Sequence, residues 1–171
     1  MRTPMIKLPV LQRAFTLIEI AIVLVIIGVL AALAMPDLSV MAVRGQIKES
    51  GPLMDVAKKG VGAVYALTGA MPKDNVEAGL PEPEKLVGKY VAGITVVDGA
   101  VQVKWGNTVH ENLRGKILTI RPAYVDGQQA VPIAWTCAAA PVPTGMAIAG
   151  LDKTDMPAKF LPLECKAREI K

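Results

Sequence analysis

The clearest pattern in the chain is a continuous apolar stretch near its N-terminus. Residues 15–35 read FTLIEIAIVLVIIGVLAALAM, and Glu19 is the only charged residue among them. About 20 apolar residues in a helix cross the hydrocarbon core of a bilayer. The charged residues before the stretch, Arg2, Lys7 and Arg13, are all basic. We therefore expect the N-terminus to stay in the cytoplasm and the rest of the chain to be exported.

Two ordinary explanations of this stretch leave Glu19 unexplained. A secretory signal peptide would be cut after the small residues Ala32-Leu33-Ala34. A plain single-pass anchor would not be cut at all. Both account for the hydrophobicity, but a carboxylate inside a bilayer costs roughly 3 kcal/mol on insertion scales. Glu19 is therefore a candidate functional residue.

After the apolar stretch, residues 37–68 have the pattern of a continuing helix. Apolar residues recur on it at helical spacing, at Leu53, Val56, Ala57, Val61, Val64 and Leu67. We expect this stripe to pack against a sheet. Ser50-Gly51-Pro52 interrupts the pattern, and two local structures fit it. Either Ser50 caps a new helix that has Pro52 in its first turn, or the helix bends there.

The second half of the chain has the pattern of strands. Residues 69–89 are rich in Gly, Pro and charge, which predicts a loop with one short helical turn. The β-rich segments that follow are 90–97, 101–105, 116–125 and 131–137. Asp98-Gly99 joins the first pair and Asp126-Gly127 the second, and Asp-Gly is a strong hairpin signal. Four antiparallel strands after a long helix predict an α+β fold.

The net charge of +4 is concentrated at the N-terminus. Residues 1–14 contain three basic residues and no acidic one, which leaves 16 basic and 15 acidic residues in the rest of the 171-residue chain. The body is therefore almost neutral. Nucleic acid stays open as a partner, but the charge gives it no particular support.

Cys137 and Cys165 are the only cysteines. An even number in an exported chain predicts a disulfide, whereas in a cytosolic chain both would be free thiols. With one distant histidine, His110, they fall short of a four-ligand zinc site.

The chain has no phosphate-binding glycine loop and no HExxH or CxxC motif. Its two serines, Ser39 and Ser50, lie on the expected helix, which argues against a serine hydrolase. We therefore expect that the chain has no enzymatic activity and binds no cofactor or metal.

The residues around Glu19 resemble the cleavage and assembly motif of type IV prepilins. Residues 13–19 read RAFTLIE. In that family a dedicated peptidase cuts before the apolar run and methylates the new N-terminal residue, and a Glu four positions further on serves assembly. The resemblance implies cleavage between Ala14 and Phe15, N-methylation of Phe15 and a role for Glu19 in subunit assembly. The family usually has Gly in place of Ala14.

The resemblance continues through the apolar stretch. Gly28, Ala31, Ala32 and Pro36 fall where pilins carry a glycine, an alanine pair and a proline. In the family this implies local unwinding of the helix within the filament, with Gly28 and Pro36 as the flexible positions. The alternative is a simple kink, because proline removes a helical hydrogen bond.

The resemblance also divides the chain and extends to its C-terminus. It implies a leader peptide at 1–14, a transmembrane and assembly half of the helix at 15–36, and an exported globular domain at 37–171. The strand order resembles the type IVa pilin domain. A disulfide between Cys137 and Cys165 would enclose a surface-exposed loop, as it does in pilins.

The function implied by this resemblance is that of a type IVa major pilin. Such a chain is an inner-membrane precursor and then a subunit of an extracellular pilus on the cell surface. Its partners are other copies of itself, the prepilin peptidase and the inner-membrane assembly machinery. These filaments serve twitching motility, adhesion and sometimes DNA uptake.

Two other functions compete with this one. A pseudopilin of a type II secretion system shares the N-terminal motif, but the cysteine pair near the C-terminus and the chain length favour the pilin. An envelope-anchored binding protein that never polymerises would not need Glu19.

Overall fold

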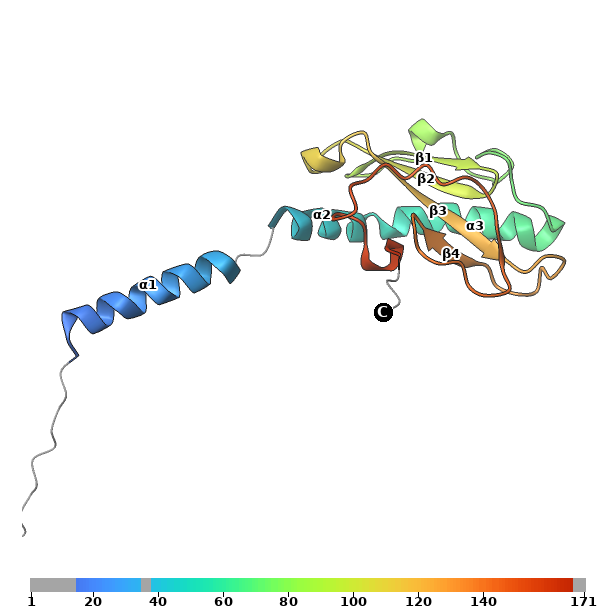
Figure 1. The fold of residues 1–171 in the computed structure, drawn as a ribbon. Coiled ribbons are helices and arrows are strands. Elements are labelled where there is room, and N and C mark those ends of the chain that lie inside the picture. Colours follow the sequence, from blue (N-terminus) through green and yellow to red (C-terminus); the bar gives the residue numbers. More distant parts are fainter. Residues whose placement is uncertain (1–14, 35–37, 168–171) are drawn as a thin grey trace, which may run out of the picture. The chain divides into compact units, whose positions relative to one another are not determined.

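The structure is a computed structural model that describes residues 15–34 and 38–167. The chain divides into two units. The first contains helix α1, Leu17–Ala34, and the second begins at Leu38 and contains the remaining helices and all the strands (Figure 1). Ala14 and Pro36 lie outside the described residues.

Helix α1 is an apolar helix with Glu19 in its first turn. Thr16 caps its start, because the Glu19 backbone N–H donates to the Thr16 carbonyl oxygen at 3.1 Å and to its Oγ1 at 3.3 Å. The large apolar side chains of α1 are all exposed, from 46% at Val23 to 92% at Leu17. By length and composition, the helical segment that begins at Leu17 could cross a membrane.

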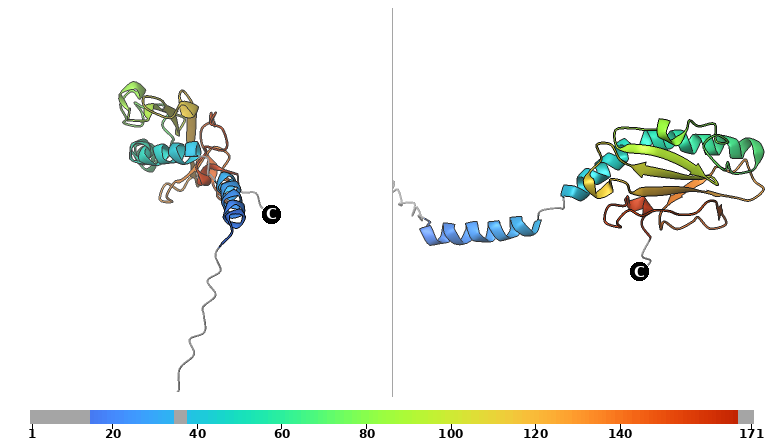
Figure 2. Two further views of the ribbon diagram at one scale, coloured as in Figure 1. Left: turned by 90° about the vertical axis from the view of Figure 1, so that its left-hand side faces the viewer. Right: turned by 90° about the horizontal axis from the view of Figure 1, so that it is seen from above.

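Helices α2 (Leu38–Glu49) and α3 (Gly51–Thr68) meet at Ser50. Pro52 lies in the first turn of α3 as predicted. Ser50 does not cap α3, since its hydroxyl makes no capping bond and instead donates to the Gln46 carbonyl oxygen at 2.9 Å. The chain bends at this junction (Figure 2, right). Of the two alternatives, the bend is correct and the Ser50 cap is wrong.

The buried stripe of α3 differs in part from the predicted one. Its buried residues are Met54, Ala57, Val61 and Tyr65. Their spacing of three and four places them on one narrow helical face. Val56 and Leu67, which were expected in the stripe, are exposed, Leu67 to 86%. The prediction was wrong there because six apolar positions cover a wider arc than the sheet contacts.

The sheet is antiparallel with the strand order β1-β2-β3-β4. These strands are Val91–Val97, Ala100–Trp105, Ile117–Tyr124 and Ala134–Cys137. A fifth short strand, β5 (Ala147–Ile148), pairs with β3 and was not expected. Helix α3 lies along the sheet (Figure 1), and Trp105 and Phe160 are among the largest fully buried side chains. The predicted α+β fold is confirmed.

The two Asp-Gly pairs form different connections. Asp98 and Gly99 make a two-residue hairpin turn in which both have positive φ, 49° and 80°, and Val97 pairs with Ala100. This is the I′ type of turn that Asp-Gly favours. Gly127 also has positive φ, 69°, but lies in the longer connection between β3 and β4.

A side chain from the preceding loop covers part of the outer edge of β1. Asn75 is only 4% exposed. Its Oδ1 accepts from the Val96 N–H at 2.6 Å, and its Nδ2 donates to the carbonyl oxygens of Ile94 and Pro81, both at 2.9 Å. The amide thus takes the place of a neighbouring strand at an edge that would otherwise expose its backbone groups.

The C-terminal segment is held to the sheet at several places, among them strand β5, the disulfide and Asp155. Cys137, at the end of β4, forms a disulfide with Cys165 in the short helix η3 (Leu163–Cys165), as predicted. Asp155 covers backbone at the start of β3, where its Oδ1 accepts from the Ile117 N–H at 2.6 Å. The loop enclosed by the disulfide is therefore attached to the sheet along its length.

Replacing Asn75 with Ala should lower the free energy of unfolding of the globular domain by about 1–3 kcal/mol, because buried backbone groups of β1 lose their partners. Urea unfolding of the full chain in detergent, followed by the fluorescence of Trp105 and Trp135 in the globular domain, measures this change. Asn112→Ala, an exposed control, should change it by less than about 0.5 kcal/mol. Equal effects of the two variants would contradict the edge-covering role.

Replacing Cys137 or Cys165 with Ser should lower the same unfolding free energy by about 3–4 kcal/mol, the chain-entropy value for a loop of this length. Membrane insertion of α1 should be unchanged, since α1 belongs to the other unit. Peptide mapping of the non-reduced, alkylated wild-type chain provides the check. Two alkylated thiols would rule out the disulfide.

Candidate functional site

The first candidate site is the beginning of α1. Phe15 and Glu19 are both exposed, and Glu19 has no ion-pair partner among the described residues. Four helical residues correspond to a rise of about 6 Å, or roughly one turn. A carboxylate in the first turn interacts favourably with the unpaired N–H groups of a helix N-terminus. Glu19 is thus available to a partner outside its own chain.

The predicted positions around this site are only partly described. Gly28 lies within α1, and no neighbouring atom lies within 4 Å of the place where a Cβ would be. Packing within the described chain therefore does not require glycine there. Ala14, on the leader side of the predicted cut, and Pro36 lie outside the described residues, so their roles stay predictions.

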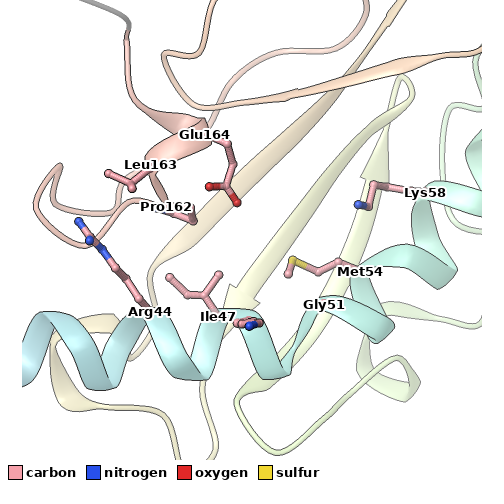
Figure 3. A pocket seen from close by; sticks show the side chains of 9 residues that line it. Arg44, Ile47, Gly51, Met54, Lys58, Pro162, Leu163 and Glu164 are labelled. Atoms are coloured by element: carbon pink, nitrogen blue, oxygen red, sulfur yellow. The ribbon is translucent and has the colours of Figure 1, made fainter.

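The second candidate site is a groove of about 510 Å³ on the globular domain, which sequence reasoning did not find (Figure 3). We refer to it as the α2–α3 groove. It is lined by Arg44, Ile47, Lys48, Gly51, Met54, Lys58, Pro162, Leu163 and Glu164. The first six come from α2 and α3 and the last three from η3 and the residue before it, which are far apart in sequence. No sequence pattern could reveal this contact without knowledge of the disulfide.

The groove has an apolar floor and a mostly basic rim. Ile47 and Met54 form the floor and are buried in the core cluster. Lys58 is paired with Asp55 at 2.6 Å. Arg44 and Lys48 have no carboxylate within ion-pair distance among the described residues, and the Arg44 Nε is buried without a partner. The groove can therefore receive a segment that is both apolar and acidic.

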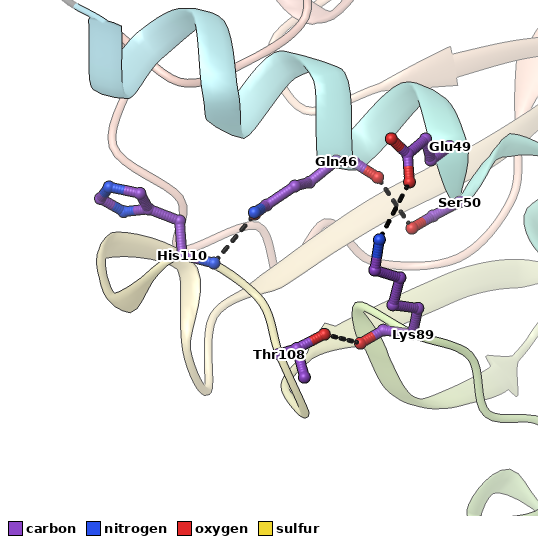
Figure 4. A network of polar contacts seen from close by, with 6 residues as sticks. All are labelled: Gln46, Glu49, Ser50, Lys89, Thr108 and His110. Carbon is purple, nitrogen blue, oxygen red and sulfur yellow. Dashed lines mark hydrogen bonds and ion pairs between the residues drawn. The ribbon is translucent and has the colours of Figure 1, made fainter.

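A polar network on another side of α2 fixes this helix to loops of the sheet (Figure 4). The His110 backbone N–H donates to Gln46 Oε1 at 2.8 Å, and Lys89 Nζ lies 3.8 Å from Glu49 Oε2. The Thr108 hydroxyl donates to the Lys89 carbonyl oxygen at 2.8 Å. The pKa of the Lys89 ammonium is raised, mainly by the Tyr90 side chain and to a smaller extent by the Glu49 carboxylate. This network holds α2, which carries Arg44 and Lys48, against these loops.

His110 has a structural position in this network. Its Nδ1 accepts a hydrogen bond from the Asn112 N–H at 3.3 Å and so caps the short helix η2 (Glu111–Leu113). Among the described residues, no group of three or more His, Cys, Asp or Glu side chains could hold a metal ion.

Comparison with known families gives two matches in series along the chain. Residues 11–35 match the prokaryotic N-terminal methylation motif, and residues 43–166 match the family described as pilin (bacterial filament). The first match includes Phe15, Glu19 and Gly28. The second includes the α2–α3 groove and both cysteines.

Three relatives illustrate the similarity. The type IV major pilin protein PilE of Neisseria gonorrhoeae is 35% identical over 128 residues, which cover 74% of each chain. A PilE1 protein of the same species is 33% identical over 163 residues, covering 91% of this chain and 88% of the relative. The type IV major fimbrial protein FimA of Dichelobacter nodosus is 30% identical over 168 residues, covering 91% and 97%. With both family matches in place, the chain belongs to the type IV pilin family.

Proposed function

We propose that this chain is the precursor of a subunit of a type IV pilus. It enters the inner membrane through α1, is cut by the prepilin peptidase between Ala14 and Phe15, and is methylated at Phe15. The inner-membrane assembly machinery then adds it to a filament of identical subunits on the cell surface. Glu19, Gly28 and Pro36 act in assembly.

The observation that carries this proposal is the position of Glu19. It is the only charged residue in an exposed apolar helix, and it lies within the matched methylation motif. A membrane anchor without further function would be more stable with an apolar residue at this place. A partner that arrives during assembly would explain why this position carries a carboxylate.

Cleavage would supply that partner. A cut after Ala14 creates an α-amine at Phe15, whose ordinary pKa is about 7.7–8.0. An amine and a carboxylate in an apolar environment are each costly alone and much less costly as a pair. Glu19 of an incoming subunit would therefore pair with the Phe15 amine of a neighbour. This pairing would also fix the axial stagger between the two helices.

Flexibility of the helix is a second part of the proposal. Gly28 has low helix propensity, and Pro36 cannot donate a backbone hydrogen bond. In a filament, local unwinding between these positions would let the subunit adjust its length to its neighbours. The proposed uses of the filament are twitching motility, adhesion and DNA uptake.

N-terminal sequencing of the mature protein tests the processing step. We expect the mature chain to begin at a methylated Phe15, because the cut leaves the apolar run attached. An ordinary signal peptidase would instead remove residues 1–34. A mature chain that begins at Met35 would refute the proposed function.

Replacing Glu19 with Val tests the assembly step. The variant should be exported, cleaved and stable in the membrane, since the cost of a buried carboxylate is gone. It should nevertheless yield at least about tenfold fewer filaments when it is the only pilin, because the neighbour's amine has no partner. Electron microscopy counts the filaments, and immunoblotting matches the subunit levels.

Two matched variants control this experiment. Ile20→Val, a neighbouring change in the same turn, should leave filament number unchanged. Glu19→Asp keeps the charge with a shorter reach and should give an intermediate number. Normal filament numbers in Glu19→Val would remove the charge-pairing mechanism.

A further inference from the structure

The loop before β1 contains an acidic segment that complements the α2–α3 groove. Residues 74–84 carry four carboxylates and no basic residue. They are Asp74, Glu77, Glu82 and Glu84. Val76, between the first two, is 77% exposed. The segment thus combines negative charge with a protruding apolar side chain.

We propose that the α2–α3 groove of one subunit binds the acidic segment 74–84 of another copy of the chain. In this contact Val76 packs on the apolar floor at Ile47 and Met54, and the carboxylates face Arg44 and Lys48. The inference rests on the proposed function, because it names a contact between neighbouring subunits of the filament.

The two surfaces are separate within one chain. No residue of 74–84 lines the groove. Two different patches of one chain that bind each other across copies make a heterologous contact, which produces an open helical filament when the rotation does not close into a ring. The position of the two surfaces therefore suits a chain that polymerises.

The charges on both sides are available for such a contact. Glu84 has no ion-pair partner among the described residues, and Glu82 is paired only with Lys85, at 3.0 Å in a largely exposed pair. Exposed pairs of this kind contribute little and are easily exchanged. On the groove side, Glu164 is the one lining carboxylate among three cations. Complementary charge of this kind sets the register and suppresses wrong pairings.

Asp74 and Glu77 have a local role in addition. Asp74 Oδ1 accepts from the Glu77 N–H at 2.9 Å, and Glu77 Oε2 accepts from the Lys73 N–H at 2.8 Å. These bonds hold the turn that presents Val76. Substitutions that test the charge contact are therefore best made at Glu82 and Glu84, which leave this turn intact.

Reciprocal charge reversal of the full chain tests the inference. Arg44→Glu with Lys48→Glu should reduce filaments per cell at least about tenfold, because like charges then face each other across the contact. Glu82→Lys with Glu84→Lys should do the same. A chain that carries all four changes should restore filament number to within about twofold of wild type. The counts are made by electron microscopy at matched subunit levels in immunoblots.

Two substitutions outside both surfaces serve as controls. Lys104→Glu and Glu111→Lys reverse exposed charges outside both surfaces and should leave filament number unchanged. Unchanged filaments in the groove variant, or a loss that the four-fold variant does not restore, would overturn the inference. If the groove variant keeps its filaments but they lose binding to a fluorescent DNA duplex, the groove serves a nucleic acid and the inference is wrong. Absence of filaments from the wild-type chain would instead contradict the proposed function.

Discussion

The apolar surface of α1 is the constraint on which the rest of this protein depends. None of its large apolar side chains is buried against described residues, and burying apolar surface is worth about 25 cal/mol for each Å². A bilayer covers this surface but penalises Glu19. In the proposed filament, a bundle of α1 helices from several copies would cover the same surface and offer Glu19 an amine. This difference would favour transfer of the subunit from the membrane into the filament.

Side chains of the globular domain bond backbone groups of the sheet at two places. Asn75 covers part of the outer edge of β1, and Asp155 binds backbone at the start of β3. Exposed strand edges are templates for pairing with other chains. At these two places the backbone groups are bonded within the domain and are not free to pair with another chain. The α2–α3 groove is the side-chain surface that we propose for contact between copies.

Local signals in the sequence predicted much of the fold. Asp98-Gly99 specified a hairpin turn because both residues tolerate positive φ. The two cysteines predicted their disulfide because an even count in an exported chain leaves few alternatives. The resemblance of residues 13–19 to the prepilin motif predicted the family, and the pilin match over residues 43–166 supports it from a different part of the chain. In each case the information lies within a few neighbouring residues or in a simple count.

The features that escaped prediction depend on contacts between distant residues. Asn75 could be recognised as the cover of β1 only once the loop was placed beside Ile94 and Val96. Tyr65 joined the buried stripe of α3 because its ring meets Tyr124 edge-on, with centroids 5.3 Å apart. The α2–α3 groove needs η3, which the disulfide holds beside the sheet. A buried polar residue such as Asn75 has no periodic pattern along the chain that would mark it.

Helical reconstruction of filaments sheared from the cell surface would test the central claim most directly. We expect that this chain forms the filament and that copies of α1 pack against one another in its interior. Each Glu19 carboxylate should lie within ion-pair distance of a neighbouring Phe15 amine. A filament built from this chain in which Glu19 faces solvent, or meets no amine, would contradict this expectation.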